Sequence, residues 1–272
     1  MNLPHYVDVH THLTHPEFKA DLEQVIQRAH DANLGAIVVN GLGPNSNREI
    51  LQLSAKYPII KAALGIYPIE AVNEHLPTDF KIPCERFSVK DEIRFIESQA
   101  KEGKILAIGE CGLDAHHLEA ETFGQQEQVF SALIQIAMKS DIPVIVHSRK
   151  REQRVFEILA EHGITKVNMH CYSGKTKWAI DAAETWGWRF SIPANLERSH
   201  SFQTLAKKLP PECLLTETDA PYLGPEPGVR NDPANVVRTI RYLSTLRAWT
   251  EEEARDRVWK NYLDLFAPPR KT

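Results

Sequence analysis

The chain has 272 residues, of which 42% are hydrophobic and 25% are charged. This composition is typical of a globular protein with a substantial core and excludes a disordered chain. Its length suits a single α/β barrel, which takes about 250 residues. The net charge of −4 and the pI near 6.3 exclude a general electrostatic attraction to duplex nucleic acid, so local charges would have to hold any anionic substrate.

The first predicted strand, residues 7–13, carries two histidines among apolar residues. Side chains alternate along a strand, so His10 and His12 lie on one face, with Asp8 one step behind them. Two imidazoles in this arrangement can hold one divalent ion, but two ring nitrogens do not complete a coordination shell. Histidines on an apolar strand are also typical of a hydrogen-bonded core, so the metal interpretation depends on ligands from later strands.

Helices and strands then alternate along the chain. Apolar spacing predicts a helix over 21–33, a strand at 36–40, a helix beginning near Ser46 and a third strand at 59–66. The stretch 71–87 has two prolines and no clear periodicity, which predicts a loop insertion, either a substrate lid or an ordinary variable segment.

The fourth predicted strand, 105–109, ends directly in Glu110. A carboxylate at the end of a buried apolar strand needs a partner that packing alone does not supply. Strands are also predicted at 143–146, 167–169, 188–192 and 214–218, each after an amphipathic helix. Three of these strands likewise end in a ligand-type side chain, namely His147, His170 and Asp219.

Eight strands alternating with helices, without tight hairpins, predict one α/β domain over residues 1–272, a closed parallel (β/α)8 barrel of the TIM type. In this fold the carboxyl ends of the strands form the face where active sites are built. The candidate ligands at this face are too many for one ion but fit a pair, with Glu110 placed as the bridge. They are His10, His12, Glu110, His147, His170 and Asp219.

The end of the chain carries no predicted chemistry. Thr250 and Glu253 form the capping-box pattern of a last amphipathic helix, Phe266 is expected to pack it onto the barrel, and 267–272 are expected to form a flexible tail. No leader-like segment and no run of membrane-spanning length is found, so we expect a cytoplasmic protein without membrane contact. The cysteines lie far apart without C-x-x-C spacing, which is typical of reduced thiols.

Several motifs follow one another along nearly the whole chain. They are V-D-V-H-T-H-L at 7–13, A-I-G-E-C-G-L-D at 107–114, P-V-I-V-H-S-R at 143–149, M-H-C-Y-S-G at 169–174, E-T-D-A-P-Y-L at 217–223 and R-N-D-P at 230–233. In this order they resemble the TatD family of metal-dependent nucleases, which belongs to the amidohydrolase-like barrels. The resemblance implies the same ligands, with His10, His12 and Asp219 on one ion, His147 and His170 on the other, and Glu110 shared.

Two positions depart from the family pattern. Family members commonly have His-Pro after the third strand, where this chain has Tyr67-Pro68, and an acidic residue after the arginine of the fifth strand, where this chain has Lys150. Neither position is a metal ligand, so these changes bear on substrate choice and nuclease activity. The stretch 71–87 also looks longer than is usual for the family.

The expected chemistry is hydrolysis by a metal-activated water. Two divalent ions facing Glu110 and Asp219 leave the pocket locally positive, lower the pKa of a shared water and neutralise charge that develops on a phosphodiester. Asp219 is expected to accept a proton as well as bind metal. Histidine-rich ligation admits zinc, manganese or iron and suits magnesium less well, although the family is often regarded as magnesium-supported, so the expected cofactors are two ions of magnesium, manganese or zinc.

Substrate contacts are predicted near the strand ends. Arg149 and Arg230 could each bind a phosphate oxygen bidentately, or form a surface ion pair. Tyr67 and Tyr172, together with Tyr222, could stack on the bases of a single strand, or pack the rim of the barrel.

Two further carboxylates, Glu217 and Asp114, could orient the histidine ligands or make turn contacts outside the site.

Three functional hypotheses stay open. The first is a nuclease that cleaves DNA, with single-stranded ends or RNA as alternatives, which the two phosphate-seeking arginines favour. The second is an amide, ester or lactone hydrolase with the same metals, and the third is a non-catalytic binding subunit of a larger complex, kept open by Tyr67 and Lys150.

Overall fold

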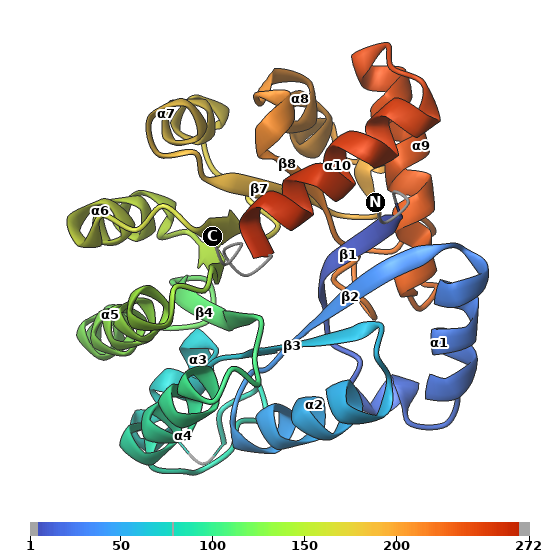
Figure 1. The fold of residues 1–272 in the computed structure, drawn as a ribbon. Coiled ribbons are helices and arrows are strands. Elements are labelled where there is room, and N and C mark those ends of the chain that lie inside the picture. The colour runs from blue at the N-terminus through green and yellow to red at the C-terminus, as the bar shows by residue number, and fades with distance from the viewer. Residues whose placement is uncertain (1–4, 78, 267–272) are drawn as a thin grey trace.

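A computed structural model describes residues 5–77 and 79–266. Within them, eight strands form one sheet in the order β1 to β8, each parallel to the next, and helices lie around the outside (Figure 1). The strands are β1 (Tyr6–Thr11), β2 (Leu34–Asn40), β3 (Ile60–Leu64), β4 (Ala107–Asp114), β5 (Val144–Arg149), β6 (Val167–Met169), β7 (Arg189–Ile192) and β8 (Leu214–Thr216). The predicted (β/α)8 barrel is confirmed.

The strand-helix alternation is regular, apart from the short extra helix after β3 and a second helix after β8. The α-helices of the described residues are α1 (Leu22–Asp31), α2 (Pro44–Lys56), α3 (Pro68–Ala71), α4 (Val89–Lys101), α5 (Phe123–Ser140), α6 (Glu152–His162), α7 (Thr176–Trp186), α8 (His200–Lys208), α9 (Val236–Arg247) and α10 (Glu251–Phe266). None of these helices combines the length and the apolar character needed to cross a membrane. Helix α2 begins before Ser46, because Pro44 has the fixed φ that suits a first helical residue.

Two strands run beyond the ends predicted for them. β4 continues to Asp114 and β5 to Arg149, and the two strands pair over this extension, with Gly112 opposite His147 and Asp114 opposite Arg149. Glu110 and His147 therefore lie inside strands, not just after them.

Hydrogen bonds close the barrel between β1 and β8. The amide of Asp219 donates to the carbonyl of His10 over 2.9 Å, and the amide of His12 donates to the carbonyl of Ala220 over 2.8 Å. The buried carboxylate of Asp8 accepts from the amide and the hydroxyl of Thr218. This seam fastens the histidine-bearing end of β1 to the segment that carries Asp219.

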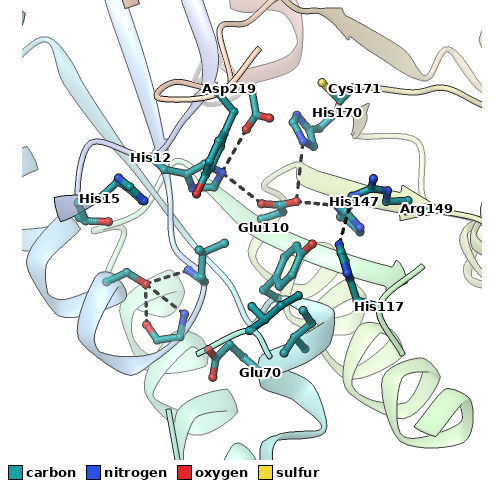
Figure 2. Close-up of a pocket in the computed structure, with 18 of the residues that line it drawn as sticks. His12, His15, Glu70, Glu110, His117, His147, Arg149, His170, Cys171 and Asp219 are labelled. Atoms are coloured by element: carbon teal, nitrogen blue, oxygen red, sulfur yellow. Dashed lines mark hydrogen bonds and ion pairs between the residues drawn. The ribbon is translucent and has the colours of Figure 1, made fainter. Parts of the chain in front are cut away.

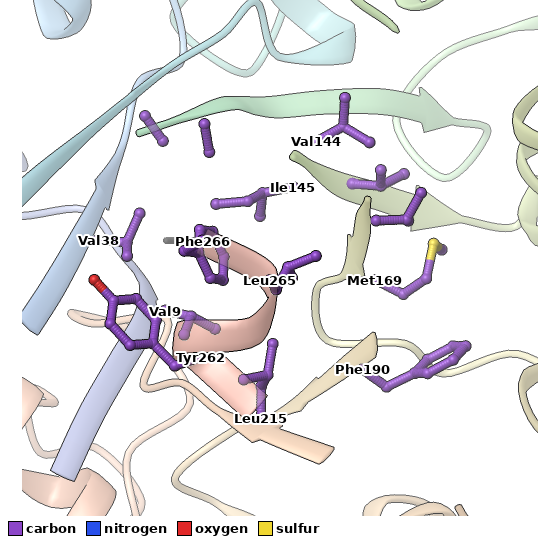
Figure 3. Close-up of a cluster of buried hydrophobic side chains, with 14 of the residues drawn as sticks. Val9, Val38, Val144, Ile145, Met169, Phe190, Leu215, Tyr262, Leu265 and Phe266 are labelled. Atoms are coloured by element: carbon purple, nitrogen blue, oxygen red, sulfur yellow. The ribbon is translucent and has the colours of Figure 1, made fainter. Parts of the chain in front are cut away.

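Helix α10 crosses the barrel and packs against its strands (Figure 1). It begins with the predicted capping box, in which Thr250 and Glu253 exchange hydrogen bonds of 2.9 and 3.1 Å. Phe266 is 3% exposed and lies among strand side chains such as Val9 and Ile145 (Figure 3). The predicted packing of Phe266 is confirmed, whereas the tail predicted at 267–272 lies outside the described residues.

Residues 71–77 and 79–87 connect α3 to α4 and pack around a small apolar cluster. A small apolar cluster gathers Ile69, Val72, Leu76 and Leu118, with Ile82 packed against it. The guanidinium of Arg86 donates to the carbonyls of Asn73 and Leu76. This arrangement brings the side chains around Ile82 to the wall of the central cavity.

Candidate metal centre

Glu110 lies at the centre of the predicted ligands, and its two oxygens face different histidines (Figure 2). Its Oε2 lies 3.5 Å from Nε2 of both His10 and His12. Its Oε1 lies 3.0 Å from Nδ1 of His147 and 3.9 Å from Nε2 of His170. One carboxylate therefore divides four imidazoles into two pairs.

Asp219 completes the side of His10 and His12. Its Oδ1 lies 3.3 Å from Nε2 of His12 and 3.6 Å from Nε2 of His10. The rings of His10 and His170 stack at 3.6 Å, which joins the two sides of the centre. The structure thus brings all six predicted ligands together.

The spacing of the donor atoms fits divalent ions. Two ligand atoms that lie about 2.1 Å from one ion at a tetrahedral angle are separated by about 3.4 Å. Nε2 of His10 and Nε2 of His12 lie 3.1 Å apart, and both lie 3.3 to 3.6 Å from Asp219 Oδ1. Mixed imidazole and carboxylate donors at this spacing suit zinc or manganese.

The carboxylates at the centre are ionised despite their burial. Burial raises the pKa of Glu110, but hydrogen bonds with His10 and His147 and the charges of His10 and His170 hold it well below its usual range. Burial likewise raises the pKa of Asp219, but the hydrogen bond to His12 and the charge of His170 lower it overall. Both groups are therefore ready to bind a cation at neutral pH.

Glu217 and Asp114 each contact one of the candidate metal ligands, at the ring nitrogen that does not face Glu110. Oε2 of Glu217 lies 2.9 Å from Nδ1 of His170, and Oδ2 of Asp114 lies 3.0 Å from Nε2 of His147. Burial lowers the pKa of His170, but the charge and hydrogen bond of Glu217 outweigh it and raise the pKa to about 10. A carboxylate in this position sets which ring nitrogen carries the proton.

Two supporting groups were missed by the sequence analysis. The backbone carbonyl of Asn40 lies 3.2 Å from Nδ1 of His12, and the hydroxyl of Ser191 donates to Glu217 over 2.6 Å. A backbone carbonyl leaves no trace in residue type, and Ser191 lies on β7, one of three strands for which no metal ligand was predicted.

A cavity of about 1010 Å³ opens above the metal centre. Tyr67 and Arg149 line it, and the Tyr67 ring meets the His147 ring edge-on at 4.9 Å. Tyr222 also lines the cavity and is 52% exposed. Lys150, which departs from the family pattern, is exposed and does not belong to the described residues that line the cavity.

Arg230 and Tyr172 do not line this cavity within the described chain, contrary to their prediction as substrate contacts. Two nitrogens of Arg230 donate to the two carboxylate oxygens of Asp21 over 2.8 and 2.6 Å. The donors that would bind a phosphate bidentately are therefore already paired with Asp21. Tyr172 is 2% exposed, and its hydroxyl donates to the carbonyl of Lys175. Arg230 thus has the ion-pair arrangement and Tyr172 the packed one.

The cavity contains polar side chains that the sequence analysis did not select. Nε2 of His117 lies 3.3 Å from the guanidinium of Arg149. Burial raises the pKa of Glu70 to about 7, and this carboxylate accepts from the amide of Glu85. His117 lies in a loop and Glu70 in the four-residue helix α3. Segments of this kind have no periodic sequence pattern from which the direction of a side chain could be predicted.

Known proteins resemble this chain over nearly its whole length. The family model described as "TatD related DNase" matches residues 7–267. Deoxyribonuclease TATDN3 of Homo sapiens is 34% identical over 264 residues, which cover 96% of this chain and 94% of the human protein. The "3'-5' ssDNA/RNA exonuclease TatD" of Dickeya dadantii is 28% identical over 276 residues, covering 97% of this chain and 98% of that protein.

The fold leads to the same group of proteins. The crystal structure of YjjV, a TatD homologue from Escherichia coli K12, superposes with a TM-score of 0.82 at 25% identity, covering 97% of this chain and 98% of YjjV. The family match, the human relative and the shared barrel agree with the motifs that carry the six candidate ligands. The chain belongs to the TatD family.

Proposed function

We propose that this chain is a metal-dependent nuclease that hydrolyses phosphodiester bonds of DNA, with Glu110 bridging two divalent ions. The observation that carries the proposal is the division of contacts at Glu110, whose Oε2 faces His10 and His12 while its Oε1 faces His147 and His170. His10, His12 and Asp219 hold one ion, and the other two histidines hold the second. The ions are magnesium, manganese or zinc, and imidazole donors favour the last two.

Each protein group has a defined part in the reaction. When bound, the two ions lower the pKa of water and offset charge on the phosphodiester. Asp219 lines the cavity, and its carboxylate oxygen accepts a proton from the attacking water. Arg149 binds the phosphate backbone of the substrate through its guanidinium, and Tyr67 bounds the cavity beside His147.

The relatives and the cavity both bear on the substrate. The human relative is named a deoxyribonuclease and the Dickeya dadantii relative a single-stranded DNA and RNA exonuclease. A cavity of about 1010 Å³ has the size of a pocket for a small molecule, which suits a strand end or a single nucleotide better than a duplex. DNA with single-stranded ends is therefore the proposed substrate, and RNA is the alternative.

The test is hydrolysis of end-labelled single- and double-stranded DNA and RNA by protein that has been chelated and then loaded with magnesium, manganese or zinc. Glu110→Ala is expected to lose most of the activity and to bind fewer ions, whereas the exposed Glu212→Ala is the matched control. Near-normal turnover by Glu110→Ala would contradict the bridging role. Two bound ions without cleavage would instead indicate an amide, ester or lactone substrate.

A further inference from the structure

Arg149 and His117 form a polar pair on the wall of the cavity. Nη1 of Arg149 lies 3.3 Å from Nε2 of His117, and both side chains line the cavity. In Figure 2 the pair lies on one side of Glu110, and His15 lies on the other. The pair therefore occupies one end of the space above the metal centre.

Within the part of the chain that the structure describes, no carboxylate forms an ion pair with Arg149. Among the described residues that line the cavity, Arg149 is the only arginine or lysine, and no acidic side chain of the described chain forms an ion pair with it. Arg230, in contrast, is held by both oxygens of Asp21. Arg149 is thus open to an anionic ligand, whereas Arg230 is not.

The turn that carries His117 is fastened to the metal centre. Oδ1 of Asp114 accepts from the amides of His116 and His117 over 2.7 and 2.8 Å. Oδ2 of the same carboxylate lies 3.0 Å from Nε2 of His147. The amide of Ala115 also donates to the carbonyl of Arg149 over 2.9 Å. These contacts hold the pair at a set position relative to a metal ligand.

Strand geometry separates the pair from the ions. Arg149 follows His147 by two residues on β5, so its backbone lies about 6.6 Å further along the strand on the same face. Successive phosphates of one nucleic-acid strand are spaced by about 3.4 Å or more along the strand axis. A strand whose scissile phosphate lies beside Glu110 can therefore place the next phosphate at Arg149 and His117.

We propose that Arg149 and His117 form a second phosphate subsite, which holds the phosphate next to the scissile one. The proposal rests on the function proposed above, in which the metal centre cleaves a phosphodiester. In the structure the guanidinium of Arg149 donates to Nε2 of His117. With a phosphate between them, an Nε2–H of the His117 ring donates to the phosphate together with Arg149. The subsite therefore adds affinity for a nucleotide that carries an additional phosphate.

The test compares substrates that differ only in the additional phosphate. The first pair is thymidine 5′-(4-nitrophenyl phosphate) with and without a 3′-phosphate, and the second pair is thymidine 3′-(4-nitrophenyl phosphate) with and without a 5′-phosphate. Together the pairs cover both strand polarities. The kcat and KM of metal-loaded wild type, His117→Ala and Arg149→Lys are measured beside His30→Ala, a control on the exposed face of α1.

In the wild type, the additional phosphate is expected to lower KM in one of the two pairs. His117→Ala is expected to raise that KM about tenfold, the effect of one hydrogen bond to a charged group, without changing kcat or the KM of the single-phosphate ester. Arg149→Lys keeps the charge but loses the forked donor, so it gives a smaller rise. An equal rise for both members of a pair would assign these residues to the scissile phosphate and overturn the proposal, as would no rise for either.

Binding provides a readout that does not depend on turnover. Thymidine 3′,5′-bisphosphate is expected to bind metal-loaded wild type more tightly than either monophosphate by calorimetry, and His117→Ala is expected to lose this difference. If the wild type cleaves neither ester but still prefers the bisphosphate, the subsite stands and the nuclease function fails. Equal affinity for the bisphosphate and the monophosphates would overturn the subsite itself.

Discussion

Replacing Glu217 by glutamine is expected to weaken one metal position while the barrel stays folded. The carboxylate is fully buried, and both of its oxygens accept hydrogen bonds. Oε1 accepts from the amide of Cys171 over 2.9 Å, and Oε2 accepts from the hydroxyl of Ser191 and lies 2.9 Å from Nδ1 of His170. A side-chain amide of the same shape has to place its NH2 group against one of these donors.

The size of the effect follows from the two positions open to that NH2 group. At the Oε1 position it would meet the amide of Cys171, and two opposed buried donors cost about 1–3 kcal/mol. At the Oε2 position the hydroxyl of Ser191 can rotate, and His170 can accept at Nδ1 by moving its proton to Nε2. A protonated Nε2 cannot bind metal. Loss of such a supporting group typically lowers metal affinity about 10- to 100-fold, or about 1.4–2.7 kcal/mol.

The assay is a metal titration of chelated protein with zinc or manganese, beside the exposed control Glu212→Gln. Glu217→Gln is expected to bind the ion on the side of Glu110 that faces His170 about 10- to 100-fold more weakly and the other ion normally. Circular dichroism checks that the variant is folded. Wild-type affinity for both ions would refute the conclusion that Glu217 sets the tautomer of His170.

Three other perturbations test the electrostatics and the packing. Burial lowers the pKa of His170 but Glu217 raises it to about 10, so metal binding has to release a proton, and affinity should fall about tenfold for each pH unit that titrations are carried below that value. Asp8→Ala should lower the free energy of unfolding of the metal-free protein in urea by about 3 kcal/mol, because it leaves the buried amide of Thr218 unpaired. Arg230→Ala should leave KM unchanged and cost at most about 1 kcal/mol of stability, since it removes a partly exposed ion pair; a large rise in KM would instead place Arg230 at the substrate.

Strand periodicity and the barrel architecture together predicted which side chains gather at the candidate metal centre. His10 and His12 were assigned to one face by alternation, and the barrel architecture then brought the ends of distant strands to one side. The ends of β4 were not predictable in this way. Residues 111–114 stay extended because they pair with β5, and Asp114 finds its partner Arg149 only in the folded sheet. A local pattern contains no information about that pairing.

The two arginines show the same limit more sharply. Arg149 and Arg230 have the same side chain and each belongs to one of the quoted motifs, but Asp21 neutralises Arg230 from 209 residues away. No window of sequence around Arg230 reveals this partner. Tyr172 is similar, because its burial depends on Phe156 and Phe190, which come from a different helix and a different strand. Residue type predicted which side chains could bind substrate, and tertiary contacts decided which of them lie in the cavity.

Two buried carboxylates couple the metal centre to the loops around it. Asp114 lies against His147 with one oxygen and holds the turn of His117 with the other. Glu217 lies against His170 with one oxygen and holds the amide of Cys171, which follows β6, with the other. Each carboxylate therefore contacts a candidate metal ligand and also holds the backbone of an adjoining loop. Because one carboxylate holds both groups in each case, we expect the position of each loop and the orientation of its imidazole to be coupled.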